Sequence, residues 1–272
     1  MNLSFSGLSK GYEGKIILEN IKGQITDGDK IGLIGANGVG KTTLVKILTG
    51  GEERDAGEIS YSPTYIKTLY LPQNPKFDKG LSVYEDIVKF LFQWARNNNS
   101  NHVDDIDVLA KTALNRVGLG EEMWSRQAIN LSGGEKTKLV LSRMFVCDFD
   151  FLVLDEPTNH LDMESYEWLE DFIKSLDKPM LIVSHDRFFL DNVVNTIWEL
   201  TPSELKVYQG NYTNYKLQKE IETKNITKEY HKQQTKIQQL KAVISDRENW
   251  YHKAHKSAGQ NDYLRARAKK HA

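Results

Sequence analysis

One run of residues has the composition and spacing of a phosphate-binding loop. Gly35 to Thr42 reads GANGVGKT, and its glycines let consecutive backbone N–H groups wrap around phosphate oxygens. Lys41 can reach the β- and γ-phosphates of a nucleotide, and the hydroxyl of Thr42 can bind Mg²⁺. The run follows a strand-like segment and precedes the helix-like TLVKIL. We therefore predict a nucleotide site made by Gly35, Ala36, Asn37, Gly38, Val39, Gly40, Lys41 and Thr42.

A second group lies at the end of the apolar run Phe151 to Leu154, where Asp155 and Glu156 are adjacent. A buried strand that ends in two acids can place one carboxylate near a metal ion and the other near a water molecule. We predict that Asp155 faces Mg²⁺ through the water shell of the ion. We also predict that Glu156 is the general base, or the water-orienting group, for attack on a γ-phosphate.

A third group precedes these acids. LSGGE, at Leu131 to Glu135, is a turn of small residues at the start of a helical pattern. The first N–H groups of a helix lack partners and the helix dipole is positive there, so this turn predicts an anion site. The predicted contacts are Ser132, Gly133, Gly134 and Glu135.

Three single residues have both an ordinary and a functional interpretation. Tyr12, beside a glycine turn, is either a surface aromatic or a platform for adenine stacking. Gln73 follows a strand and is either a satisfied polar residue or a contact to Mg²⁺ and the attacking water. His185 is either a buried histidine bonded to backbone or a γ-phosphate contact, since open α/β sheets bind ligands beyond the C-terminal ends of their strands. The phosphate-binding loop favours the functional interpretation of all three.

The elements that must position these residues form an α/β pattern. We expect strands within residues 3–34, at 57–60 and 65–71, through Leu154, at 180–184, and as a pair within 195–208.

Helical patterns occupy most of residues 81–146 and the segment 163–176. In the first of these, Phe90, Phe92 and Trp94 are expected in a core rather than at a cofactor. Asp162 is expected to cap the second helix, a role compatible with a place at a dimer contact.

Composition excludes several classes of protein. The chain has 272 residues, enough for one large domain with an appendage or for two domains. No apolar run approaches the roughly 18 residues of a membrane span, and the N-terminus lacks a secretory pattern. Cys147 is the only cysteine, which excludes a disulfide framework and a zinc site built from cysteines. We expect a cytoplasmic protein with no membrane part.

The formal net charge of −1 hides an asymmetry, because residues 215–272 hold 14 Lys and Arg against 6 Asp and Glu. This region has a narrow apolar stripe at heptad spacing, which predicts one helix of a two-helix coiled coil. The stripe consists of Ile226, Leu240 and Arg247 on one track and Tyr230, Ile237, Ile244 and Tyr251 on the next.

Residues 247–272 combine basic side chains with Trp250, Tyr251 and Tyr263. Basic groups for phosphates and aromatic rings for unpaired bases suit RNA better than a generic solvated surface. The chain ends in LRARAKKHA, with no helix stop signal. We therefore expect a fragment of a longer protein.

Together and in this order, these motifs resemble those of ATP-binding cassette (ABC) domains over residues 3 to about 200. The resemblance implies an α/β fold of the ABC-type P-loop NTPase class over residues 1–211, with a β-sheet core and a helical subdomain at about 76–146. A long α-helical coiled-coil linker would follow over 212–272. It also implies ATP and Mg²⁺ as cofactors. The residues so assigned are Tyr12 for adenine stacking, Gly35 to Lys41 with Thr42 and Thr43 for phosphates, Thr42, Gln73 and Asp155 for Mg²⁺, and Glu156, His185 and Gln73 for catalysis.

Within that superfamily, EPTNHLD, SHDRFFLDNV and VYQGNYTNY are similar to the F group, ABC-F. Such proteins carry two ABC domains joined by a charged helical linker, lack a transmembrane part, and act on the ribosome. The resemblance therefore implies ATP hydrolysis, with ribosomal RNA and the P-site tRNA near the peptidyl-transferase region as partners of the basic linker. The short segment 74–130 and the Gln-rich linker favour the members that protect ribosomes from antibiotics.

Other functions stay open. A housekeeping translation factor of the same family is one alternative. The ATPase subunit of a membrane transporter is another, disfavoured by the basic coiled coil that continues the domain. A DNA-maintenance ATPase of the SMC type is the least favoured, because there the coiled coil interrupts the ABC domain.

The resemblance also implies that the active site is divided. In ABC dimers, the acids matched by Asp155 and Glu156 serve the nucleotide held at Lys41, whereas the turn matched by Ser132–Gly134 caps a nucleotide on the opposing domain. We expect this chain to bind ATP but to hydrolyse it weakly without a partner. The partner would be a second ABC domain or a second copy in a head-to-tail pair.

Overall fold

The computed structural model describes residues 1–98 and 105–269, with side chains described as far as Arg247. The chain divides into a body, Met1–Lys216, and a second unit that begins at Leu217. The two units are described separately below.

A six-stranded sheet forms the centre of the body. Its strands are parallel except for the last, which returns antiparallel in a hairpin. The spatial order is β5 (Thr68–Leu71), β6 (Phe151–Asp155), β7 (Met180–Val183), β3 (Lys30–Ile34), β8 (Thr196–Thr201) and β9 (Glu204–Gln209).

Both faces of this sheet are covered, as expected for parallel strands with continuous apolar sequences. Every residue of β6 and β7 is buried. Because successive side chains alternate between faces, Phe151 and Val153 join one core while Leu152 and Leu154 join the other. The predicted buried strands are confirmed.

One of the two cores holds helix α1 (Lys41–Leu48) together with a second, antiparallel sheet. That sheet has the order β2 (Lys15–Thr26), β1 (Asn2–Tyr12) and β4 (Ala56–Ser62). The other core holds the other described helices between β5 and β8. They are α2 (Val83–Asn97), α3 (Ile106–Arg116), α4 (Glu121–Trp124), η1 (Ala128–Asn130), α5 (Gly133–Ser142), η2 (Arg143–Phe145), α6 (Met163–Ser175) and α7 (Arg187–Val193).

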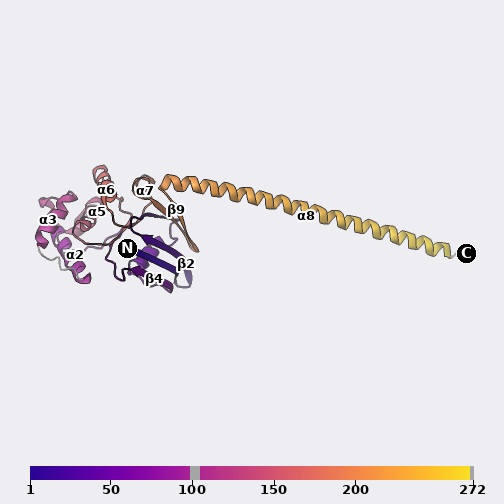
Figure 1. Cartoon of the computed structure of the whole chain (residues 1–272), viewed down its shortest axis with the longest axis horizontal. Helices are drawn as coiled ribbons and strands as arrows, with labels where there is room; N and C mark the ends of the chain where they lie inside the picture. The colour runs from indigo at the N-terminus through magenta and orange to yellow at the C-terminus, as the bar shows by residue number, and fades with distance from the viewer. Residues whose placement is uncertain (99–104, 270–272) are drawn as a thin grey trace. The chain divides into compact units, whose positions relative to one another are not determined.

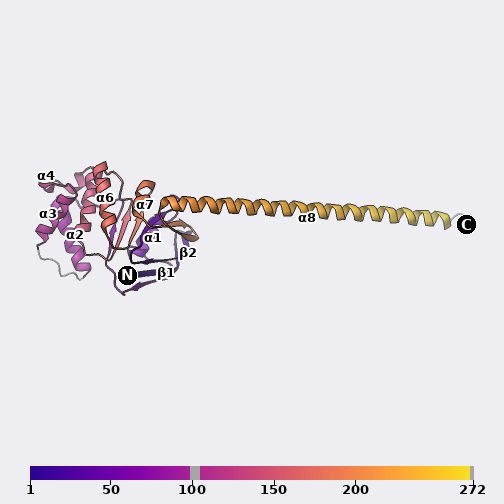
Figure 2. The same cartoon turned by 45° about the horizontal axis from the view of Figure 1, so that its top comes forward.

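The helices α2, α3 and α5 lie together on one side of the body, away from β1, β2 and β4 (Figures 1 and 2). A buried ion pair ties this group together: Arg143 in η2 lies 3.0 Å from Asp86 in α2, with its guanidinium 4.2 Å from the centre of the Phe90 ring. Phe90 and Trp94 pack against the core as predicted. The prediction for Phe92 was wrong, because its side chain is 53% exposed. It lies two residues from Phe90 and so points to nearly the opposite side of the helix.

The second unit consists of helix α8 (Tyr212–Lys269), whose first turns belong to the body. The described part of this segment is one continuous helix from Tyr212 onward. Its apolar stripe is solvent-exposed at Ile226, Tyr230, Ile237, Leu240 and Ile244. Pairing of this stripe in a coiled coil stays a prediction. Trp250, Tyr251 and Tyr263, predicted to contact RNA, come after Arg247, beyond the side chains that the structure describes.

Candidate functional site

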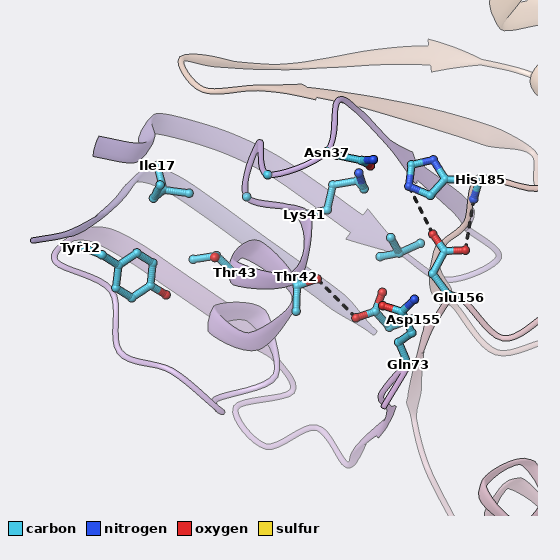
Figure 3. A pocket seen from close by; sticks show the side chains of 13 residues that line it. Tyr12, Ile17, Asn37, Lys41, Thr42, Thr43, Gln73, Asp155, Glu156 and His185 are labelled. Carbon is cyan, nitrogen blue, oxygen red and sulfur yellow. Dashed lines mark hydrogen bonds and ion pairs between the residues drawn. The ribbon is translucent and has the colours of Figure 1, made fainter. Parts of the chain in front are cut away.

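A cavity of about 520 Å³ opens where the C-terminal ends of the parallel strands meet the start of α1. Figure 3 shows Tyr12 at one end of it, Glu156 and His185 at the other, and Lys41 and Thr42 between them. The residues that line it are Tyr12, Ile17, Asn37, Gly38, Gly40, Lys41, Thr42, Thr43, Gln73, Asp155, Glu156, Val183 and His185. Eleven of these were singled out from the sequence, and Ile17 and Val183 were not.

The loop between β3 and α1 includes a backbone conformation that only some residue types adopt easily. Gly40 has a φ of 110°, and a Cβ there would lie 2.8 Å from a methyl carbon of Ile17 and 2.9 Å from one of Leu18. A side chain at this position would meet both strain and steric conflict. The glycine therefore lets the loop approach β2 closely, and α1 begins at the next residue with its N-terminus toward the cavity.

Lys41 is buried, and its ammonium group donates hydrogen bonds to the carbonyl oxygens of Gly35, at 2.8 Å, and Ala36, at 3.2 Å. Burial lowers the pKa of this lysine, and the nearby carboxylates of Glu156 and Asp155 oppose that shift. Gly35 and Ala36 thus contact Lys41 through their carbonyl groups, and within the described residues they are not among those that line the cavity. Val39, whose N–H donates to the Ala36 carbonyl, belongs to the core below the loop.

Asp155 ends β6 and is 5% exposed. Its Oδ2 lies 3.5 Å from the hydroxyl of Thr42 and 3.3 Å from the hydroxyl of Tyr70. Burial raises the pKa of Asp155, and these two hydroxyl donors oppose the shift. Gln73, after β5, lines the same end of the cavity beside Asp155 (Figure 3).

The donors at this end of the cavity fit Mg²⁺. Thr42, Gln73 and Asp155 offer a hydroxyl, an amide and a carboxylate oxygen, and Mg²⁺ commonly uses one or two carboxylates together with substrate phosphates and water. In the part of the chain that the structure describes, no cluster of three or more His, Cys, Asp or Glu side chains could hold a metal ion. A Mg²⁺ site completed by nucleotide phosphates and water does not need such a cluster.

Glu156 directly follows β6 and is 9% exposed. Its φ of 52° is in the left-handed region, a conformation that costs a non-glycine residue about 1 kcal/mol. It aims the carboxylate at His185, whose backbone N–H donates to Oε2 at 3.3 Å and whose Nε2 lies 3.5 Å from Oε1 (Figure 3). Burial raises the pKa of Glu156. A strained, desolvated acid beside a histidine has the properties of a group that takes part in proton transfer.

Tyr12 ends β1 with its side chain 43% exposed. Its hydroxyl donates a hydrogen bond to Glu52, which follows α1, and the ammonium of Lys10 lies 5.5 Å from the ring centre. Ile17 of the neighbouring strand lines the cavity on the same side (Figure 3). An exposed ring with an aliphatic neighbour provides a flat apolar wall at the end of the cavity farthest from the acids. The β1–β2 hairpin pairing is the signal that could have pointed to Ile17.

The LSGGE turn lies elsewhere. Within the described residues, none of its predicted contacts, Ser132, Gly133, Gly134 or Glu135, is among those that line the cavity. Ser132 caps α5 in a reciprocal arrangement: its Oγ accepts the Glu135 N–H, and the Glu135 carboxylate accepts the Ser132 N–H at 2.7 Å. The structure thus keeps this turn apart from the cavity that Asp155 and Glu156 line.

The loop before α6 packs against this turn. A Cβ at Gly134 would lie 2.6 Å from the carbonyl oxygen of His160, so only glycine fits there. Asp162 caps α6 by accepting the Ser165 N–H at 2.8 Å, and it lies 3.0 Å from the ammonium of Lys138. Hydrogen bonds from the hydroxyl and the backbone N–H of Ser165, together with that from Lys138, lower the pKa of Asp162 to about 2. The predicted capping role of Asp162 is confirmed.

Comparison with known families settles the class of protein to which this fold and cavity correspond. The family model described as ABC transporter matches residues 18–159, more than half of the chain, and a second model with the same description matches residues 198–269. The chain belongs to the ABC transporter family. ABC ATP-binding domains generally bind ATP with Mg²⁺.

Three relatives show which kinds of protein this ABC chain is similar to in sequence. The putative ATP-binding protein YdiF of Bacillus subtilis (strain 168) is 34% identical, with a match that covers 90% of this chain and 43% of that protein. ABC transporter F family member 5 of Arabidopsis thaliana is 30% identical, covering 89% and 40%. The ATP-binding protein Uup of Buchnera aphidicola is 36% identical, covering 84% and 38%. Members of the F group are thus homologues, and the chain spans about two fifths of their length.

Solved structures confirm the predicted α/β fold of the P-loop NTPase class. The dimeric, post-hydrolysis structure of the ATP-binding cassette MJ0796 bound to ADP and Pi has a TM-score of 0.68 at 19% identity, covering 76% of this chain and 98% of that one. An ATP-binding subunit of an ABC transporter has a TM-score of 0.66 at 20% identity, covering 77% and 90%. Over residues 1–98 and 105–269, no helix is long and apolar enough to cross a lipid bilayer.

Proposed function

We propose that this chain is an F-type ABC protein that hydrolyses ATP in a site shared with a second cassette and that acts on the ribosome. The observation that carries the ATPase part is the convergence of Lys41, Thr42, Gln73, Asp155, Glu156 and His185 on one cavity. They come from the start of α1 and from the ends of β5, β6 and β7. Each group has a role in phosphoryl transfer to water.

ATP would lie along the cavity with its base against Tyr12 and its γ-phosphate toward Glu156. The Lys41 ammonium, now bonded to two carbonyl oxygens, would donate instead to charged phosphate oxygens, which form stronger hydrogen bonds. Mg²⁺, when bound at Thr42, Gln73 and Asp155, supplies charge neutralisation at the phosphates.

The hydrolytic step transfers the γ-phosphoryl group to water. A water oxygen forms a bond to the γ-phosphorus, the bond from that phosphorus to the bridging oxygen breaks, and ADP and phosphate are released. The Glu156 carboxylate accepts a hydrogen bond from this water and orients it, or takes its proton. The upward shift of its pKa suits a general base. His185, whose Nε2 lies 3.5 Å from Oε1 of Glu156, would contact the γ-phosphate at the same end of the cavity.

A second cassette is part of the proposal because the Ser132–Gly134 turn does not face the cavity of its own chain. The related MJ0796 cassette is dimeric with ADP and Pi. By analogy, the turn would cap a nucleotide on the opposing cassette, either in the same longer chain or in a second copy arranged head-to-tail.

The ribosomal part of the proposal rests on relatives of the F group and on the charge of residues 215–272, where 14 Lys and Arg stand against 6 Asp and Glu. Such a segment suits a phosphate-rich partner. The linker would reach the P-site tRNA near the peptidyl-transferase region, in the cytoplasm. Protection of ribosomes from antibiotics is the role we favour, and a housekeeping role in translation is the alternative.

Co-sedimentation with ribosomes tests the proposal. The Glu156→Gln variant should retain ATP without hydrolysing it and should pellet with ribosomes in ATP but not in ADP. Adding Lys41→Met to this variant should abolish pelleting, whereas Glu164→Gln, an exposed change on α6, should behave as wild type.

Failure of Glu156→Gln to pellet with ribosomes in ATP would contradict the ribosomal role, and a membrane protein in its pull-down would support a transporter subunit instead. Drug susceptibility of cells that express the full-length gene separates the two ribosomal roles. Susceptibility that does not change across ribosome-targeting drugs would favour the housekeeping role.

A further inference from the structure

Tyr70 lies next to the predicted Mg²⁺ ligands without being one of them. It is partly buried on β5, and its hydroxyl lies 3.3 Å from Oδ2 of Asp155. Nothing in the sequence pattern singled it out. Within the described residues it is not among those that line the cavity, so a direct contact with nucleotide does not account for its hydroxyl.

The bond joins a neutral donor to a buried acid. An ionised carboxylate only accepts hydrogen bonds, so the Tyr70 hydroxyl donates. Burial of the ring and the charge of Asp155 both raise the pKa of Tyr70, which keeps its proton on the oxygen. Removal of this donor would leave the Asp155 carboxylate less well compensated for its desolvation.

The geometry also restricts how the carboxylate rotates. The Thr42 hydroxyl lies 3.5 Å from the same oxygen, Oδ2, so two hydroxyls on different elements converge on one atom. Together they fix the rotation of the carboxylate about its Cβ–Cγ bond. Thr42 is itself a predicted ligand, so its hydroxyl would be engaged by Mg²⁺ when the ion is bound. Tyr70 would then be the donor that continues to hold Asp155.

The strand register links Tyr70 to the rest of this end of the cavity. β5 and β6 are parallel neighbours, with Tyr70 opposite Val153 and Leu71 opposite Leu154. Gln73 follows on the same segment, three residues after Tyr70. β5 thus carries the hydroxyl that orients Asp155, and the segment directly after β5 carries Gln73, another predicted Mg²⁺ ligand.

We propose that Tyr70 is a positioning residue for the Mg²⁺ site, which holds the Asp155 carboxylate in the orientation that the ion and its water shell require. This inference rests on the proposed function. Partners of this kind behind a metal ligand typically contribute about ten- to a hundredfold to metal affinity.

The test compares Tyr70→Phe with Tyr61→Phe. Both changes remove one hydroxyl from a partly buried ring in the same core. The Tyr61 hydroxyl, however, contacts the carbonyl of Leu48, at 3.4 Å, at the end of α1 farthest from the cavity. ATP affinity is measured by calorimetry in EDTA and in Mg²⁺. Mn²⁺ affinity in the presence of ATP is measured by electron paramagnetic resonance.

For Tyr70→Phe we expect unchanged ATP affinity in EDTA and Mn²⁺ affinity about tenfold weaker than wild type, while Tyr61→Phe matches wild type in both. Mn²⁺ affinity equal to wild type in Tyr70→Phe would overturn the assignment, and so would an equal loss of ATP affinity with and without metal. A wild-type chain that binds no ATP in either buffer would overturn the proposed function as well, which distinguishes the two failures.

Discussion

The carboxylate of Asp191, in α7, accepts a hydrogen bond from the backbone N–H of Thr213 at 2.6 Å and another from its hydroxyl at 3.0 Å. The side chain of Asn211 donates to the Asp191 carbonyl at 3.3 Å. The first turn of α8 is therefore capped twice, by Asn211, whose Oδ1 accepts the Asn214 N–H at 3.1 Å, and by Asp191 from another helix. Because α7 begins two residues after His185, the segment that faces Glu156 and the start of the linker are joined through one short helix. The same bonds join SHDRFFLDNV to VYQGNYTNY, two motifs that the sequence presents separately.

Asp191→Ala tests this joint. Loss of a capping carboxylate typically costs about 1 kcal/mol of stability, and here we expect the loss at the start of α8. Amide hydrogen exchange in residues 212–216 should accelerate, and the free energy of unfolding should fall by about that amount. The control is Asp171→Ala on the exposed side of α6, which should leave exchange at α8 unchanged. Equal exchange at α8 in both variants would show that the contact between Asp191 and Thr213 does not stabilise the start of α8.

Glu156→Gln is expected to stabilise the nucleotide-free chain near neutral pH. Burial raises the pKa of Glu156 above its ordinary value of 4.5, so the folded chain binds this proton more tightly than the unfolded chain does. The free energy of unfolding therefore falls as pH rises from 4.5 through the raised pKa, and the loss is constant above it. Glu156→Gln removes the titrating carboxyl group, so the free energy of unfolding of the variant does not fall in this way. In the wild type the fall amounts to about 1.4 kcal/mol for each unit of pKa shift.

Urea denaturation across this pH range measures the difference between the two proteins. We expect the advantage of Glu156→Gln to shrink as pH falls toward 4.5. A variant that is less stable than wild type at neutral pH would show that the contacts with His185 outweigh the desolvation of the carboxylate.

Gly40→Ala should destabilise the chain more than Gly14→Ala does. Both positions have positive φ, 110° and 83°, but a Cβ at Gly14 has no atom within 4 Å, whereas one at Gly40 meets Ile17 and Leu18. Strain alone should cost about 1 kcal/mol, and the steric conflict should add about 1–3 kcal/mol. Chemical denaturation of both variants provides the measurement. Equal losses of stability would mean that β2 yields to the added methyl group and that the loop can lie farther from β2.

Part of this site could be predicted from the sequence, because its signals are local. Glycine spacing identifies the phosphate-binding loop, and an apolar run identifies the strand that delivers Asp155 and Glu156. Tyr70 gives no such signal, since its contact with Asp155 depends on the parallel register of β5 against β6. The bond between Asp191 and Thr213 likewise depends on how α7 packs on the start of α8.

The error at Phe92 has a different origin. The helix was predicted correctly, but all three aromatic residues were assigned to the core without regard to helical phase. In α2, Phe90 and Trp94 are four residues apart and share the buried side, which leaves Phe92 facing solvent. A sequence predicts such positions only when the phase of each helix is considered along with its apolar content.

A complementation experiment on ATP hydrolysis tests the central claim most directly. One variant, Lys41→Met, loses its phosphate-binding lysine but keeps the Ser132–Gly134 turn; another, Ser132→Arg, loses the turn but keeps the lysine. We predict that neither hydrolyses ATP alone and that wild-type turnover per chain rises with protein concentration. An equal mixture should recover about a quarter of wild-type turnover, because half of randomly formed head-to-tail pairs then hold one intact site out of two. Turnover that is independent of concentration, with no recovery on mixing, would contradict the shared site.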